Sequence, residues 1–404
     1  MKLITFLLLS SLLVKSTLMG ATVWQLPPPT LEDLSKVPMN LARNYLGADA
    51  STPGGAGGVS PASGVGLLVA DDQAGGSDLS AESKTVVLSL SDATLINRVS
   101  FFSFTAGGTA DVAYALVPGD EKQGKWQTIQ RGVGFKPNSA FALDFTAADA
   151  RYVRMTFNTS TAGAISAMLI SGTPKVSQFQ LPTPAVGIDL RQNTGSASTQ
   201  QTSGAVPTVD YDFASLDANA YVLFLGGGDP TEAIRVVDQD TATACSLNPK
   251  AGENLIVVDF RRPVNYYRIS IILSGPGGKL DIFSLSGLPN DIAKEGTKDP
   301  LQVTWPEDYF KNATPLTSVD LKPSENRIVL NTGPNNARFI LIHWTPPPGA
   351  TESLNFNELS VIGKVPASDF QDFRMPAVEF SEVSPPPPPA TPPPDLPNIP
   401  PTSP

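Results

Sequence analysis

Two aspartates in one short loop are the residues whose type and spacing point most directly to chemistry. Asp238 and Asp240 lie two positions apart in the segment VVDQDTAT, so both carboxylates could converge on one cation. A hard ion such as calcium requires several oxygen ligands at once, which makes this loop a candidate calcium site. Short acidic loops also form Asx turns, in which the carboxylate caps backbone N–H groups. The residues alone leave both interpretations open.

Aromatic residues in loop-like segments form a second candidate site. Sugar binding needs an aromatic face for the apolar side of the ring and fixed polar groups for its hydroxyls. Trp305 and Tyr309 lie in WPEDYF, and Tyr211 lies in VDYDF. Asp212 and Arg235 are the candidate polar partners. The alternative is that these aromatic side chains fill a protein core, where such residues are commonly found.

Histidine and cysteine each occur once, as His343 and Cys245. A His-based zinc site needs several nitrogen ligands, and a Ser-His or Cys-His pair needs a histidine beside its nucleophile. We therefore expect His343 to be a hydrogen-bonded structural residue and Cys245 to be a buried thiol. Carboxylate-only glycosidase chemistry stays formally open, but no acidic pair has a recognisable catalytic context. The sequence predicts that the protein is not an enzyme.

The charge balance excludes some classes of partner. With 28 basic and 38 acidic residues the formal net charge is −10. Phosphate backbones and anionic lipids attract clustered Lys and Arg, so nucleic acid is not an expected partner. Proline and glycine are abundant, with 39 and 33 residues, and this composition suits many turns between short strands.

The two ends of the chain differ in composition from the rest. Lys2 followed by the mostly apolar stretch Leu3–Val14 is typical of a secretory signal. No other apolar run approaches the ~18 residues of a membrane span. We expect an exported protein that is secreted, periplasmic or on the cell surface. Of the last 20 residues 12 are proline, which predicts a disordered or stiff spacer.

Short β-branched or aromatic runs recur through the interior of the chain. Examples are TVVLSL, NRVSFFSF, DVAYALV, RYVRMTF, NLIVVDF, YYRISIIL, KLDIFSL and RFILIHW. Sustained helical periodicity is absent, so the sequence predicts an all-β protein of two antiparallel β-sandwich jelly rolls in tandem. Trp126 and Trp344 lie in strand patterns and are expected in or near the cores.

The expected organisation has six segments. They are a signal peptide (1–21), a proline-containing linker (22–39), a first β-sandwich (40–174), a second linker (175–204), a second β-sandwich (205–365) and a Pro-rich tail (366–404).

The two strand-rich blocks share an order of elements that indicates a repeat. In both, Ala-Arg-aromatic opens a strand, and a later strand closes on a glycine, Gly172 or Gly363. An acidic loop precedes these strands in each block. Several elements in the same order favour duplication over chance.

These pieces resemble the discoidin, or coagulation factor type C, domain of the galactose-binding-like jelly rolls. The resemblance rests on MNLARNYLGA, VVDQDTAT, ARYVRMTF, NELSVIG and the phrase GKWQTIQRG. It implies a structural calcium ion in the second domain, held by Asp238, Asp240, Thr243 and Glu358. The first block keeps Asp71 and Asp72 but has Ala167 where the second has Glu358, so no calcium site is expected there. No other cofactor is implied.

Two functions from different classes follow. The first is an exported, non-catalytic binding protein that contacts carbohydrate or a cell-surface glycan through its jelly-roll loops. The alternative is a structural or adhesive component of a cell surface or extracellular assembly, with a surface protein as the partner. Fold alone does not decide between them, because function depends on the site.

Overall fold

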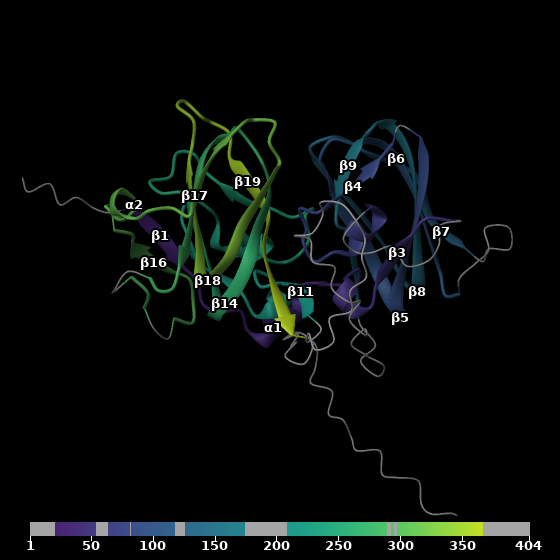
Figure 1. Cartoon of the computed structure of the whole chain (residues 1–404), viewed down its shortest axis with the longest axis horizontal. Coiled ribbons are helices and arrows are strands. Elements are labelled where there is room, and N and C mark those ends of the chain that lie inside the picture. Colours follow the sequence, from purple (N-terminus) through teal and green to yellow (C-terminus); the bar gives the residue numbers. More distant parts are fainter. Residues whose placement is uncertain are drawn as a thin grey trace, which may run out of the picture.

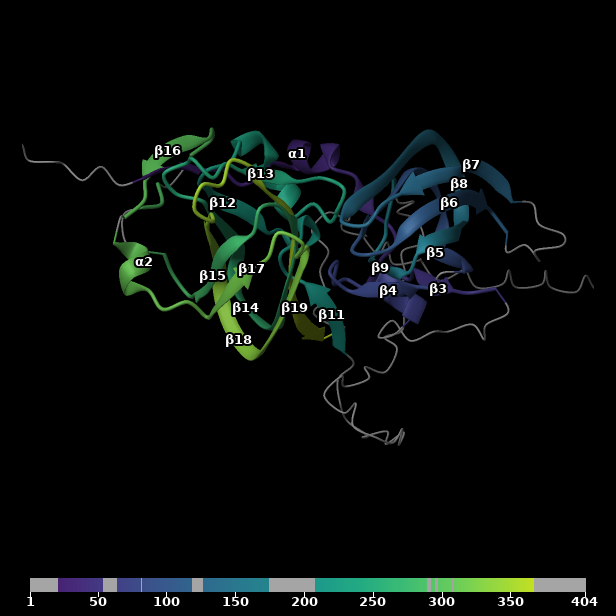
Figure 2. The same cartoon turned by 90° about the horizontal axis from the view of Figure 1, so that it is seen from above.

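The computed structural model describes residues 21–53, 64–80, 82–117, 126–173, 208–288, 292–294, 297–306 and 308–366. The predicted signal peptide, the predicted linker 175–204 and nearly all of the Pro-rich tail lie outside these residues. Two β-sandwiches lie side by side (Figures 1 and 2). The predicted fold class, all-β with two antiparallel sandwiches, is confirmed by the strand pairing.

The first sandwich spans residues 39–173 and contains nine strands in its described part, with the order β2-β10-β5-β8-β6-β7 and with β3, β4 and β9 beside this path. Short 3-10 turns cover Asn44–Leu46 (η1) and Gly64–Val69 (η2). Its strands are β2 (Met39–Asn40), β3 (Asp49–Ser51), β4 (Gly76–Leu79), β5 (Ser83–Ser103), β6 (Gly107–Ala115), β7 (Gln127–Phe135), β8 (Ser139–Thr161), β9 (Gly163–Ser166) and β10 (Leu169–Thr173).

The second sandwich contains ten strands among the described residues, in the order β16-β1-β12-β14-β18-β15-β17, with β11, β13 and β19 beside this path. Its helical elements are α1 (Leu31–Lys36), η5 (Leu216–Ala218), η6 (Pro230–Val236) and α2 (Tyr309–Asn312). Its strands are β1 (Thr22–Gln25), β11 (Thr208–Asp212), β12 (Tyr221–Leu225), β13 (Cys245–Leu247), β14 (Leu255–Ser274), β15 (Gly278–Leu285), β16 (Leu301–Thr304), β17 (Thr317–Leu321), β18 (Arg327–Thr345) and β19 (Leu354–Pro366).

The segment 22–39, expected to be a linker, instead belongs largely to the second sandwich. Strand β1 pairs antiparallel with both β12 and β16. The capping box of Thr30 and Asp33 starts α1. Leu26 and Leu34 are buried in the second core. The difference arises because Val23 of β1, Leu26 and Leu34 bury their side chains in the second sandwich, where β1 lies between β12 and β16.

The predicted strand runs all occur as strands, but some neighbours join into one. TVVLSL and NRVSFFSF form the single strand β5, whose pairing with β8 shifts register between Ser89 and Thr94. NLIVVDF and YYRISIIL form β14, which shifts against β18 between Asp259 and Val264. Such bulges let one strand bend across both layers of a sandwich. Residues such as Asp92 and Pro263, which are typical of turns, therefore lie in these bulges.

Alternation along the strands separates each core from the surface. In β8, Val153, Met155 and Phe157 are buried in the first core, as the period of two predicts. Trp344 is buried in the second core and donates from Nε1 to the Gly277 carbonyl at 2.9 Å. No helix in the described part of the chain has the length and apolar character needed to cross a membrane.

Candidate functional site

The acidic loop of each sandwich docks onto a strand of the other sandwich. Arg98 of β5 binds Asp240 of the second sandwich, with Nη2 and Oδ2 3.0 Å apart, and Ser100 Oγ donates to Asp240 Oδ1 at 2.7 Å. In the opposite direction Arg268 Nη2 lies 2.9 Å from Asp72 Oδ2. Ser270 Oγ donates to the same oxygen of Asp72 at 3.2 Å. Each sandwich therefore supplies one Arg–Ser pair that holds an aspartate of the other sandwich, and we call these two equivalent sets of contacts the clamps. We call this interface the seam.

Local structure makes the two clamp carboxylates equivalent. Asp72 Oδ1 accepts from the backbone N–H of Ala74, and Asp240 Oδ1 accepts from that of Ala242, each at 3.0 Å. Each is an Asx turn, which fixes the carboxylate before it meets the other sandwich.

One fully buried arginine lies at the centre of the seam. Arg43 has no exposed surface. Its Nη1 donates to the Ala70 carbonyl at 2.7 Å, and its Nε donates to Gln239 Oε1 at 3.2 Å. Nε also lies 3.7 Å from Asp71 Oδ1. Arg43 thus contacts the acidic loops of both sandwiches. Arg43 belongs to the segment MNLARNYLGA, whose pattern does not indicate this contact.

Four carboxyl groups surround this part of the seam: Asp71, Asp212, Asp238 and Glu358. Burial raises the pKa of each, because desolvation disfavours the charged form. For Asp212 the pKa rises to about 7. Arg43 opposes the rise at Asp71 and at Glu358. Burial therefore favours the neutral acid at all four positions, and at Asp71 and Glu358 the charge of Arg43 favours the carboxylate.

The side chains predicted to hold calcium are engaged in hydrogen bonds of the loop and the seam. Asp238 accepts from the Asp240 N–H and from Thr243 Oγ1, both at 2.9 Å, while both oxygens of Asp240 face Arg98 and Ser100. Glu358 is buried nearby. Within the described ranges no three His, Cys, Asp or Glu side chains gather as a metal-binding group. The arrangement does not fit a calcium ion and matches the turn-capping alternative.

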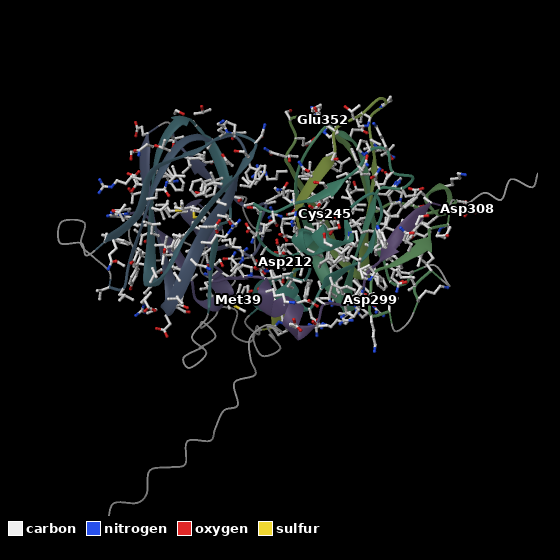
Figure 3. All side chains as sticks on the ribbon, turned by 180° about the vertical axis from the view of Figure 1, so that it is seen from behind. Met39, Asp212, Cys245, Asp299, Asp308 and Glu352 are labelled. Carbon is white, nitrogen blue, oxygen red and sulfur yellow. The ribbon has the colours of Figure 1, made fainter. Side chains whose placement is uncertain are left out.

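The predicted ligand-binding residues do not form one surface. Tyr211 and Asp212 are buried, and the Tyr211 ring contacts Tyr45 of the first sandwich with centroids 5.5 Å apart. Trp305 is also buried and packs edge-on against Tyr309. Figure 3 shows Asp212 between the two sandwiches and Asp308, the neighbour of Tyr309, at the far end of the second.

The remaining predicted polar groups have structural partners. Arg235 binds Glu232 at 2.8 Å and the Ala244 carbonyl at 3.0 Å. His343 Nε2 lies 3.0 Å from Glu253 Oε2, in agreement with the predicted structural role. Cys245 is buried, as expected, and burial raises its pKa to about 12.

An exposed recess on the first sandwich brings together groups that the sequence analysis did not connect. We call it the outer recess. It has a volume of about 110 Å³ and is lined by Asp111, Val112, Ala113, Thr128, Arg131, Arg154 and Thr156 from β6, β7 and β8. The strand register sets Asp111 opposite Thr156, and Ala113 opposite Arg154. Ala113, Thr128 and Thr156 have short side chains, which leave the hollow.

Trp126 contacts the outer recess through Arg154, whose guanidinium carbon lies 4.7 Å from the ring centroid. The tryptophan, expected in or near the core, is half-buried, and its Nε1 is buried without a hydrogen-bond partner in the described part of the chain. Neither Arg131 nor Arg154 lies within ion-pair distance of a carboxylate among the described residues. The recess therefore presents unpaired guanidinium donors beside hydroxyls and a carboxylate.

No family model and no curated protein matches the chain. It is similar to a chitosan-binding module from a Paenibacillus chitosanase/glucanase, with 22% identity over 33% of this chain and 99% of that one (TM-score 0.26). A striped bass fucolectin has 9% identity over 81% and 98% (TM-score 0.25). Allantoicase from Saccharomyces cerevisiae has 10% identity over 84% and 99% (TM-score 0.25). At these scores the fold assignment rests on this chain's own strand pairing.

Proposed function

We propose that the chain is an exported, non-catalytic protein that binds carbohydrate, and that the outer recess is its contact surface. The observation that carries the proposal is the unpaired Arg154 stacked on Trp126 beside Asp111 and two threonines. Guanidinium, carboxylate and hydroxyl groups are hydrogen-bonding partners for sugar hydroxyls. Export is inferred from the sequence alone, from the apolar segment Leu3–Val14.

The size of the recess defines the kind of contact. Its volume of about 110 Å³ is below the roughly 300–1,000 Å³ of sites that enclose a drug-sized ligand. An open contact with one unit of a longer saccharide suits this surface better than enclosure of a free sugar. The proposal moves the contact from the jelly-roll loops expected from the sequence to the face formed by β6, β7 and β8.

A glycan array tests the proposal. Binding of the mature chain, which is the chain without the predicted signal peptide 1–21, is measured in calcium and again in chelator. We expect binding in both conditions. Arg154→Ala should weaken binding about tenfold, because a charged hydrogen bond contributes roughly 1.5–3 kcal/mol. Arg151→Ala is the matched control, since Arg151 is exposed on the same strand but does not line the recess. If the unmodified chain binds no glycan on the array, carbohydrate binding is contradicted. Equal binding by both variants places the contact elsewhere.

The alternative function, a structural or adhesive component of a cell surface, is motivated by the proline-rich end, in which 12 of the last 20 residues are proline. Pro-rich segments dock into aromatic grooves of protein partners. Light scattering over a wide concentration range separates the two functions. Concentration-dependent assembly together with a silent glycan array favours the alternative, whereas a monomer that binds glycan favours our proposal.

A further inference from the structure

Arg43 has no counterpart in the second sandwich. Asn40 Oδ1 accepts from Ala42 N, two residues on, and from Ile170 N of the closing strand. Asp212 Oδ1 accepts in the same way from Ala214 N and from Val361 N. Because Asn40 and Asp212 occupy equivalent positions, the residue equivalent to Arg43 is Ser215. The guanidinium is therefore a feature of one sandwich only.

Glu358 is also a feature of one sandwich only. It lies five positions before the closing Gly363, and the residue five positions before Gly172 is Ala167. The unmatched arginine of the first sandwich and the unmatched glutamate of the second thus meet at the same seam. Both are buried, and both lie beside Gln239: Arg43 Nε donates to the Gln239 side chain, and the Gln239 backbone N–H faces Glu358.

Several buried carboxyl groups face this place, and a positive charge here stabilises any of them that is ionised. Among the described residues neither carboxyl oxygen of Glu358 has a close hydrogen-bond donor, although the Gln239 backbone N–H lowers its pKa. An isolated buried charge is costly unless an opposite charge compensates it. Arg43 faces Asp71 and reaches the second loop through Gln239. Gln239 has a left-handed backbone with φ of 63°, which is uncommon for a residue with a Cβ.

We propose that Arg43 is the resident cation of the seam, supplying from within the chain the charge that a divalent metal ion would supply to the second acidic loop. The loop is then balanced by the neighbouring sandwich instead of by calcium. The same guanidinium joins the two sandwiches, because its hydrogen bonds reach both acidic loops. The protein accordingly keeps its fold and its seam without calcium.

Thermal unfolding and calorimetric titration of the mature chain test this inference. We expect the same melting temperature in calcium chloride and in chelator, and no calcium binding tighter than millimolar. Arg43→Met removes the charge at similar length and should lower the melting temperature on the order of 10 °C. Arg43→Lys, which keeps the charge, should lower it less. If Arg43→Met does not fold, Arg43→Lys and Glu358→Gln still test the charge requirement.

A double variant separates charge pairing from a general packing loss. In Arg43→Met/Glu358→Gln the unpaired acid is removed together with the arginine, so the combined loss should be smaller than the sum of the single losses. A chelator-induced fall in the melting temperature of the unmodified chain overturns the inference. Strict additivity of Arg43→Met and Glu358→Gln overturns it as well, and so does an Arg43→Met chain as stable as the original.

Discussion

The two carboxylates that Arg98 holds provide a test of how burial controls the strength of an ion pair. Arg98 binds Asp240 across the seam with Nη2–Oδ2 of 3.0 Å and Asp144 within its own sandwich with Nη1–Oδ1 of 2.9 Å. The distances match, but the Asp240 side chain is 11% exposed and that of Asp144 is 72% exposed. Only Asp240 also accepts from Ser100.

These differences set the expected magnitudes. Asp240→Ala removes two charge-assisted contacts from a largely buried group, each worth roughly 1.5–3 kcal/mol, so we expect a loss of about 3–5 kcal/mol. Asp144→Ala removes an exposed pair, for which roughly 0.2–1 kcal/mol is typical. Asp72→Ala should match Asp240→Ala, because Asp72 makes the equivalent contacts to Arg268 and Ser270.

Equilibrium urea unfolding of the mature chain, followed by circular dichroism, measures the three losses. A double variant that adds Arg98→Ala to Asp240→Ala isolates the coupling between the two residues. The reasoning fails if Asp144→Ala costs as much as Asp240→Ala, or if the losses at Asp72 and Asp240 differ by more than about 2 kcal/mol, since either result would remove the equivalence of the clamps.

Three further predictions concern pH, the core and the thiol. Burial raises the pKa of Asp212 from 3.8 to about 7, so the contribution of this group to stability is complete below about pH 4 and is lost as the pH rises through about 7. Melting temperatures should fall over this pH range, and they should fall less in Asp212→Asn. The same pH dependence in both chains would contradict the prediction. Phe157→Ala should cost about 3–5 kcal/mol in urea unfolding because the ring is fully buried, while Val329→Ala, at an exposed position, should cost under about 1 kcal/mol. Cys245 is buried with its pKa raised to about 12, so iodoacetamide at pH 8 should label it only in denaturant. Mass spectrometry measures the labelling, and labelling of the folded chain would refute the burial.

The strands could be predicted from the sequence because their signal is local. Alternation such as that of Tyr152, Val153 and Arg154 already separates the surface from the core. The bulges in β5 and β14 could not be predicted this way, because the residues at Asp92 and Pro263 that suggest turns are also compatible with a bent strand. The pairing of β1 with β16 depends on residues far apart in the sequence, which a local pattern does not encode.

The candidate sites were less predictable because they depend on what lies opposite each residue. Asp238 and Asp240 were identified as a pair, but Arg98 and Arg43 are provided by the other sandwich. The sequence around Tyr211 does not distinguish an exposed aromatic residue from a buried one. Tyr211 is buried because it packs against Tyr45 at the seam. Trp126 and Arg154 are 28 positions apart, and strand register brings them together. Arg43 follows Leu41 and Ala42 and precedes Tyr45 and Leu46, which is a local hint that its charge is buried.

The place of β1 has a consequence for biosynthesis. This strand is made first, yet its partners β12 and β16 follow only after the entire first sandwich has been synthesised. The first sandwich can close while the second still lacks most of its strands; β1 can pair with β12 only once residues 221–225 have been made, and with β16 only once residues 301–304 have been made. Contacts so distant in sequence close slowly. Completion of the second sheet around β1 therefore depends on strands that are synthesised long after it.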